Sequence, residues 1–107
     1  MATTRDIFDE IAPAWYHFRH WSRFSRELEA LARRWQEGKL LNLGCAHGPD
    51  FLPFRQGFEL FGVDSSPEML KLARKYARKF SFKVELSVAD VRHLPYPDET
   101  FDWAISV

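Results

Sequence analysis

The residues best suited to chemistry are a turn of small residues and an acid that follows it in the next apolar run. The turn, residues 44–48 (Gly-Cys-Ala-His-Gly), directly follows the apolar run 40–43, and Pro49 and Asp50 come next. A strand, a tight glycine turn and a helix start bring backbone groups close to a nucleotide cofactor. The acid is Asp64, at the end of the second apolar run, where a carboxylate can bind the two hydroxyls of a ribose. The spacing therefore predicts a cofactor that contains a ribose.

The positions of the small residues favour one class of cofactor over another. A dinucleotide-binding turn follows the pattern G-x-G-x-x-G, which would place its third glycine at position 49. That position is Pro49, and the small residues are instead Gly44, Ala46 and Gly48. Because proline has no N–H to donate to a pyrophosphate, the turn favours a cofactor without phosphates. The alternative, half of a nicotinamide-dependent oxidoreductase, is disfavoured for the same reason.

The segment Leu-Asn-Leu-Gly-Cys-Ala-His-Gly, residues 41–48, resembles motif I of class I S-adenosylmethionine-dependent methyltransferases, in particular their type 11 group. It departs from their acid-x-G-x-G-x-G pattern at two positions, since Asn42 replaces the acid and Ala46 replaces a glycine. The resemblance implies S-adenosylmethionine as the cofactor. The cofactor-binding residues that it implies are Arg19, Gly44, Cys45, Ala46, Asp64, Ser65, Asp90 and Val91.

The resemblance also implies a role for most of these residues. The backbone of residues 44–46 meets the methionine end of the cofactor, and Arg19 contacts its carboxylate. Asp64 holds the ribose, Asp90 accepts a hydrogen bond from the adenine amino group, and the Val91 backbone meets the adenine ring. Considered without the resemblance, Asp90 has a second interpretation, a carboxylate that caps a turn or a helix. The sequence identifies no catalytic residue.

Other stretches resemble a narrower group, the methyltransferases that modify wobble uridines in tRNA. They are residues 8–13 followed by Arg19, the glycine turn, and residues 101–107. Residues 94–102 resemble a stretch of the methyltransferase family. This resemblance implies tRNA as a partner, together with a small zinc-binding activator subunit. Two alternatives stay open: a methyltransferase that acts on a small molecule, and a non-catalytic S-adenosylmethionine-binding module that a partner completes.

The hydrophobic pattern predicts helices and strands in alternation. Apolar residues recur at helical spacing in 5–12, in 22–37 and from 65–68 to Phe80, and a short helix follows Pro49. The predicted strands are 40–43, 59–64, 82–88 and 101–107. Ser22 or Ser25 would cap the helix 22–37. Ser65 and Glu68 match a capping box for the helix that follows.

This alternation predicts an α/β fold, a Rossmann-like parallel sheet with helices on both faces, truncated after the fourth strand. Residues 1–38 would form an N-terminal helical lid, and residues 39–107 the first half of a Rossmann-like methyltransferase domain. The fourth strand would lie centrally in a complete sheet. We therefore expect a fragment, a truncated form or a chain completed by a partner, with self-association through the fourth strand.

Composition sets the remaining expectations. The 107 residues carry 15 basic and 15 acidic side chains, so no global attraction to nucleic acid is evident. The basic residues of the predicted helices lie away from their apolar residues. We expect them to face solvent, with tRNA contact as the alternative. The single cysteine, Cys45, is read as a small residue that fills the turn rather than as a nucleophile, because no histidine or acid is spaced to activate it. One cysteine, and no apolar run near the roughly 18–20 residues of a membrane span, predict a cytoplasmic protein.

Overall fold

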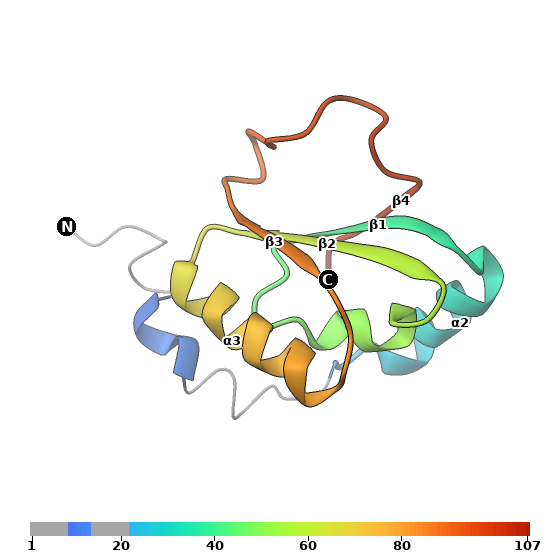
Figure 1. The fold of residues 1–107 in the computed structure, drawn as a ribbon, viewed down its shortest axis with the longest axis horizontal. Coiled ribbons are helices and arrows are strands. Elements are labelled where there is room, and N and C mark those ends of the chain that lie inside the picture. Colours follow the sequence, from blue (N-terminus) through green and yellow to red (C-terminus); the bar gives the residue numbers. More distant parts are fainter. Residues whose placement is uncertain (1–8, 14–21) are drawn as a thin grey trace.

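The chain folds around a four-stranded parallel sheet in the computed structural model, which describes residues 9–13 and 22–107 (Figure 1). The strands are β1 (Gly38–Leu43), β2 (Phe58–Asp64), β3 (Glu85–Val88) and β4 (Trp103–Ile105). The helices are α2 (Ser25–Trp35), the 3-10 helix η1 (Pro49–Phe54) and α3 (Pro67–Lys79). Residues 9–13 are also helical. The predicted α/β class and parallel sheet are confirmed.

The strand order is β3-β2-β1-β4, so β2 and β3 are added on one side of β1 and β4 on the other. The strand order therefore reverses at β1. Leu40 of β1 pairs with Leu60 of β2 on one side and with Trp103 of β4 on the other. Right-handed crossovers from β1 to β3 place their helices on one face, and the reversed crossover to β4 uses the opposite face. In Figure 1 the helices lie along one side of the sheet, and residues 89–102 arch over the other. In the part of the chain that the structure describes, a loop therefore takes the place of helices on the second face.

The core lies between the sheet and the helices. Leu40 in β1, Phe51 and Phe54 in η1, and Leu70 and Tyr76 in α3 are each 0% exposed. Partly buried side chains of α2, namely Leu31, Ala32 and Trp35, pack against this core. Residues 22–38 of the predicted lid thus contribute to the same core as the sheet. Within the described ranges, no helix combines the length and the apolar character needed to cross a bilayer.

The third strand starts later than predicted, at Glu85 instead of Phe82. The reason is how α3 ends. Ser81 adopts a left-handed conformation with φ 56°, and the Phe82 N–H donates to the Ala77 carbonyl at 3.0 Å. The Ser81 N–H donates to the Arg78 carbonyl, which completes a Schellman-type helix end. Phe82 is therefore held by the helix, and only residues 85–88 pair with β2.

Two predicted helix N-caps are wrong by one or two residues. The N-cap of α3 is Ser66, whose side chain accepts from the Met69 N–H at 3.1 Å, and not Ser65. Pro67 decides this, because proline is favoured at the first helical position. At α2 neither Ser22 nor Ser25 is the cap: the N-cap is Phe24, without a side-chain cap bond. The helix itself is shorter than predicted at both ends.

The fourth strand is also shorter than predicted, three residues instead of 101–107. Only Trp103 to Ile105 pair with β1, opposite residues 40–42. Asp102 lies at the strand entrance as the structural acid that the sequence indicates: its carboxylate accepts from the Lys39 N–H at 2.8 Å, and its own N–H donates to the Lys39 carbonyl. The Trp103 ring stacks on Trp35 with 4.5 Å between centroids, which fastens α2 to this edge.

Candidate functional site

Asp64 connects the segments that follow the first three strands. Its Oδ2 accepts from the Ala46 N–H at 2.9 Å, and its Oδ1 accepts from the Ser66 N–H at 3.0 Å. Its backbone carbonyl accepts from the Ala89 N–H at 3.1 Å. Asp64 therefore brings together the glycine turn, the β2–α3 turn and the segment before Asp90 at the carboxyl edge of the sheet. This edge lies next to the point where the strand order reverses, which is where open α/β sheets bind ligands.

The carboxylate of Asp64 keeps the capacity to bind a ribose. A carboxylate has about four acceptor positions on its two oxygens. The N–H groups of Ala46 and Ser66 occupy one position on each oxygen. With respect to the described residues, one position per oxygen is left, which is the number that two vicinal hydroxyls require. The two backbone bonds also fix the orientation of the side chain before any ligand arrives.

The turn leaves space at its first glycine. Gly44 is exposed and has φ 67°, and a Cβ added there would meet nothing within 4 Å. Ala46, at the position where the motif has glycine, also adopts a left-handed conformation with φ 51°. Such a conformation costs an L residue on the order of 1–2 kcal/mol. Ala46 adopts this strained conformation although it is not a glycine. The turn is therefore held by its surroundings, including the hydrogen bond from the Ala46 N–H to Asp64.

Hydrogen bonding within the turn determines which ligand groups it can bind. The Cys45 N–H donates to the Val63 carbonyl and the Gly48 N–H to the Cys45 carbonyl, both at 3.0 Å. The Ala46 N–H is taken by Asp64. Three N–H groups of the turn thus have protein acceptors, and Pro49 has none to give. The carbonyls of Cys45 and Gly48 also accept N–H groups of the chain. A carbonyl oxygen keeps a second lone pair, whereas an N–H that already donates has nothing further to give, so these residues offer more to a cationic group than to a phosphate.

Cys45 fills the space beneath the turn. It is 2% exposed, and its Sγ lies 2.9 Å from where a Cβ on Gly62 would be. Burial, followed by the charge of Asp64, raises the pKa of the Cys45 thiol far above its ordinary value. A thiol in this state is not a nucleophile near neutral pH. The structure therefore agrees with the packing role that the sequence indicates.

The Asp90 carboxylate forms a salt bridge with Arg92. Both of its carboxylate oxygens accept from the Arg92 guanidinium, with 2.7 Å from Arg92 Nη2 to Oδ2. Its Oδ1 also accepts from the Arg92 N–H, and its carbonyl accepts from the His93 N–H. The side-chain and backbone hydrogen bonds from Arg92 hold the pKa of Asp90 well below its usual range. This is the turn-capping role that the sequence left open as the second interpretation of Asp90.

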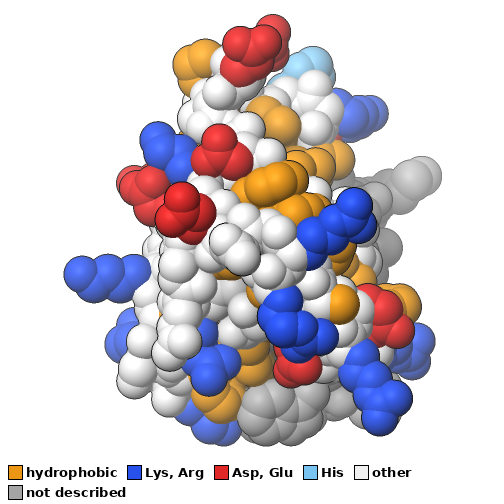
Figure 2. Space-filling view, turned by 90° about the vertical axis from the view of Figure 1, so that its right-hand side faces the viewer, with side chains coloured by type: hydrophobic (Ala, Val, Ile, Leu, Met, Phe, Trp, Pro, Cys, Tyr) orange, Lys and Arg blue, Asp and Glu red, His pale blue; other side chains and the backbone are white. Residues whose placement is uncertain are grey.

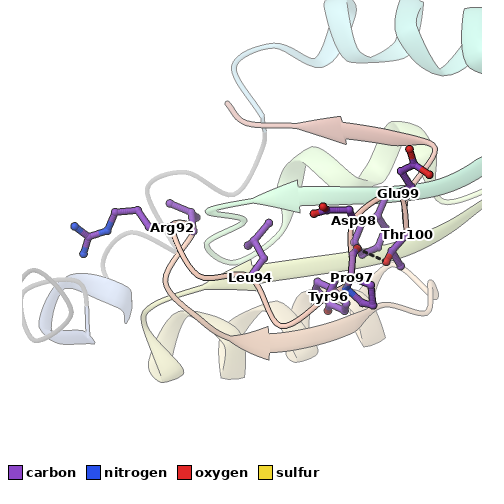
Figure 3. Close-up of a pocket in the computed structure, with 9 residues that line it drawn as sticks. Arg92, Leu94, Tyr96, Pro97, Asp98, Glu99 and Thr100 are labelled. Atoms are coloured by element: carbon purple, nitrogen blue, oxygen red, sulfur yellow. Dashed lines mark hydrogen bonds between the residues drawn. The ribbon is translucent and has the colours of Figure 1, made fainter.

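Val91 belongs to a cavity on the sheet face opposite the helices. Its side chain is 51% exposed. The cavity has a volume of about 430 Å³, within the usual size range of small-molecule sites. Figure 3 shows the Arg92 side chain extending away from the other labelled residues. The lining residues are Val91, Arg92, Leu94, Tyr96, Pro97, Asp98, Glu99, Thr100 and Phe101.

An aromatic cluster that the sequence did not reveal supports this loop. The rings of Phe61, Tyr96 and Phe101 meet edge to face, with centroids 4.9 to 6.3 Å apart. The Tyr96 hydroxyl also lies 3.3 Å from the Ser87 hydroxyl. Phe61 was recognisable only as a strand residue, since nothing in its spacing shows which loop will cover it.

The other candidate residues are placed as follows. Ser65 is half-buried and lies between Asp64 and the helix cap Ser66. Arg19, the residue predicted to meet the carboxylate of the cofactor, lies outside the described residues, as do residues 5–8 of the predicted helix 5–12. Asn42, which replaces the acid of motif I, is 1% exposed, and its Nδ2 has no hydrogen-bond partner among the described residues.

The parallel sheet, the glycine turn and the acid that meets it define a Rossmann-like domain built to hold a nucleoside. Residues 40–107 match the family described as a methyltransferase domain. The chain belongs to this family of class I S-adenosylmethionine-dependent methyltransferases. S-adenosylmethionine is the cofactor of the family, as the resemblance to motif I implied.

Curated relatives match over part of their length. Demethylmenaquinone methyltransferase from Thermus thermophilus is 31% identical over 105 residues, which are 90% of this chain and 48% of that protein. Carboxy-S-adenosyl-L-methionine synthase from Campylobacter hominis is 36% identical over 67 residues, 59% of this chain and 29% of that protein. The chain thus spans about half or less of the length of these relatives.

Solved structures share the fold. The PH0226 protein from Pyrococcus horikoshii is 39% identical with a TM-score of 0.65, over 78% of this chain and 42% of that protein. The [4+2]-cyclase SpnF has a TM-score of 0.77 at 23% identity, over 94% of this chain and 46% of that protein. Coclaurine N-methyltransferase, solved with N-methylheliamine and SAH, has a TM-score of 0.63 at 23% identity, over 76% of this chain and 26% of that protein. The last two likenesses show the fold alone.

Proposed function

We propose that this chain binds S-adenosylmethionine across the carboxyl ends of β1, β2 and β3 and holds it for methyl transfer. The observation that carries the proposal is the pairing of Asp64 with the glycine turn. The acid is locked against Ala46 with one acceptor position per oxygen to spare, and Gly44 beside it has open space. Asp64 would take the ribose hydroxyls, and the backbone of residues 44–46 would take the methionine end.

The polarity of the turn supports this cofactor over a nicotinamide dinucleotide. The N–H groups of Cys45, Ala46 and Gly48 already donate to protein acceptors, which leaves little to bind a pyrophosphate. Carbonyl oxygens have two lone pairs each and attract the ammonium of a methionyl group. The cofactor, when bound, supplies a methyl group on a sulfonium. The part of this chain is to orient that group, which is the main contribution a protein makes to such a transfer.

Replacing Gly44 with alanine tests the proposal. The added Cβ meets no protein atom within 4 Å, so the unfolding free energy should fall only by the strain of φ 67°, about 1–2 kcal/mol. The same Cβ would enter the space assigned to the cofactor. Calorimetry with S-adenosylhomocysteine should therefore show affinity that is weaker by about tenfold or more, which corresponds to about 1.4 kcal/mol.

Gly57→Ala is the matched control for this experiment. Gly57 also has a positive φ, of 86°, but a Cβ there would meet the Gln36 carbonyl, at the opposite end of β2 from Asp64. This variant should lose stability and keep its affinity when measured well below its Tm. Equal affinity of Gly44→Ala and the wild-type chain would contradict the proposed position of the cofactor. Binding of NAD by the wild-type chain, without binding of S-adenosylhomocysteine, would contradict the cofactor itself.

For the methyl acceptor we propose the modified wobble uridine of tRNA that the sequence resemblance implies, with a small-molecule acceptor as the second candidate. Exposed basic residues of α3 support the first: Lys71, Arg74, Lys75, Arg78 and Lys79. Basic side chains are not confined to α3: Figure 2 shows the side of the molecule where α2 lies, and Lys and Arg side chains are spread over its lower part among some acidic ones. The second is supported by relatives named for demethylmenaquinone, ajmaline and phosphoethanolamine. The zinc-binding activator and self-association through the fourth strand stay predictions.

A salt titration of tRNA binding separates the two acceptors. If α3 contacts phosphates, the variants Arg74→Glu and Arg78→Glu should each flatten the plot of log K against log salt by about 1. Arg33→Glu and Arg34→Glu, which are exposed on α2, should leave the slope unchanged. Equal slopes in all four variants, or binding that does not depend on salt, would contradict tRNA contact through α3 and favour the small-molecule acceptor.

A further inference from the structure

Ser66 joins three parts of the molecule through one buried residue. It is 0% exposed. Its N–H donates to Asp64 Oδ1 at 3.0 Å, and its hydroxyl oxygen accepts from the Met69 N–H at 3.1 Å. The hydroxyl proton is donated to Asp9 Oδ1, which lies 57 positions earlier in the chain. The cofactor acid, through the backbone N–H, and the start of α3 and the N-terminal segment, through the hydroxyl, therefore meet at a single residue.

Asp9 completes the hydrogen bonding of the first turn of α3. The same Oδ1 accepts from the Glu68 N–H at 3.2 Å. Pro67 has no N–H, the Met69 N–H goes to the Ser66 hydroxyl, and the Leu70 N–H goes to the Ser66 carbonyl. The donors that a helix leaves unpaired at its start are thus satisfied, one of them by a distant carboxylate. A negative charge at this end of a helix is also favourable.

Residues 9–13 lie next to this turn. Figure 1 shows their short helix beside the start of α3. Ala12, one turn after Asp9, is 0% exposed, so this short helix is partly buried in the folded chain. The hydrogen bonds of Asp9 to Ser66 and Glu68 are the polar contact between residues 9–13 and the β2–α3 turn.

We infer that Asp9 is a positioning residue for the cofactor acid Asp64, acting through Ser66. The inference rests on the proposed function, because it takes Asp64 as the group that binds the ribose. Without an acceptor at Asp9, the buried Ser66 hydroxyl and the Glu68 N–H lose their partner, and the β2–α3 turn loses the contact that holds it. The Ser66 N–H that orients Asp64 Oδ1 belongs to that turn. Docking of residues 9–13 and binding of the ribose are thus linked, and linkage between binding events is reciprocal.

The test uses Asp9→Ala and Asp9→Asn in the full chain, with Glu10→Gln as the control on the same helical turn. Glu10 is exposed and makes no hydrogen bond to the turn among the described residues. We expect Asp9→Ala to bind S-adenosylhomocysteine 5- to 10-fold more weakly than the wild-type chain. Asp9→Asn keeps a side-chain oxygen that can accept from Ser66 and Glu68, so it should recover most of the affinity. Glu10→Gln should leave the affinity unchanged.

Hydrogen exchange gives a readout that a loss of stability alone would not produce. S-adenosylhomocysteine should slow exchange at the amides of residues 9–12 and of Ser66, Glu68 and Met69 in the wild-type chain, and this protection of 9–12 should disappear in Asp9→Ala. If wild-type binds the ligand and Asp9→Ala binds it equally well, the inference is wrong while the proposed function stands. If the wild-type chain does not bind the ligand, the proposed function fails first.

Discussion

Replacing Asp64 with alanine is expected to weaken the binding of S-adenosylhomocysteine by about 1.5–3 kcal/mol, on the order of 10- to 150-fold. The carboxylate is positioned by two backbone N–H groups, from Ala46 and Ser66, and keeps one acceptor position on each oxygen. A pair of ribose hydroxyls would fill both positions with charge-assisted hydrogen bonds, which are stronger than neutral ones. Isothermal calorimetry on the two chains measures the difference directly.

The same substitution also removes two hydrogen bonds that stabilise the folded chain. The N–H groups of Ala46 and Ser66 would lose their acceptor, and each partly buried donor left unpaired costs about 1–3 kcal/mol. The binding experiment therefore needs a control that loses a comparable contact away from the site. Asp102→Ala provides it, because the Asp102 carboxylate accepts from the Lys39 N–H at 2.8 Å near the start of β1. This variant should be less stable and bind the ligand with wild-type affinity.

Unchanged affinity in Asp64→Ala, measured at a temperature where both chains are folded, would remove the acid from the ribose site. A loss of affinity that Asp102→Ala reproduces would also contradict the role of Asp64, because it would assign the effect to stability. Only a loss restricted to Asp64→Ala supports the geometry described for the carboxyl edge of the sheet.

The sheet and the central pairing of the site could be predicted from the sequence, because both follow from local signals. The apolar runs that become β1 and β2 are bounded by glycine and by acid, so their ends are well marked. Parallel neighbours place their carboxyl ends together, and this alone brings Asp64 to the turn at Ala46 across 18 positions. Strand pairing converts a spacing in sequence into a contact in space.

Features set by tertiary contacts could not be predicted in this way. The alternating pattern predicted a strand from Phe82. The Phe82 N–H is still bonded to the end of α3, and Ser81, in a left-handed conformation, changes the direction of the chain there. The salt bridge that engages Asp90 comes from Arg92, whose rotamer no spacing rule specifies. The bond from Ser66 to Asp9 joins residues 57 positions apart, and the motif around Ser66 shows only a helix start.

Gly62→Ala is expected to be the most destabilising of the small substitutions near the site. A Cβ at this position of β2 would lie 2.9 Å from Cys45 Sγ, from Phe51 Cζ and from Leu86 Cδ2. Overpacking of this kind costs about 1–3 kcal/mol. The reduced freedom of the unfolded chain returns about 0.4–1 kcal/mol, so the clash prevails. Because Cys45 belongs to the glycine turn, its displacement would also disturb the backbone beside Asp64.

Thermal and urea unfolding followed by circular dichroism measure this effect. A net loss of 1–2 kcal/mol corresponds to a fall in Tm of roughly 4–16 °C for a domain of this size. Gly44→Ala is the contrasting variant, because its Cβ has open space and only the backbone strain counts against it. The two glycines thus differ in the cause of the loss: Gly62→Ala lowers stability through three side-chain clashes, whereas Gly44→Ala lowers stability through backbone strain and places its Cβ in the space proposed for the cofactor. A Tm of Gly62→Ala within about 2 °C of wild type would show that the core between β2, η1 and the turn is looser than these contacts indicate.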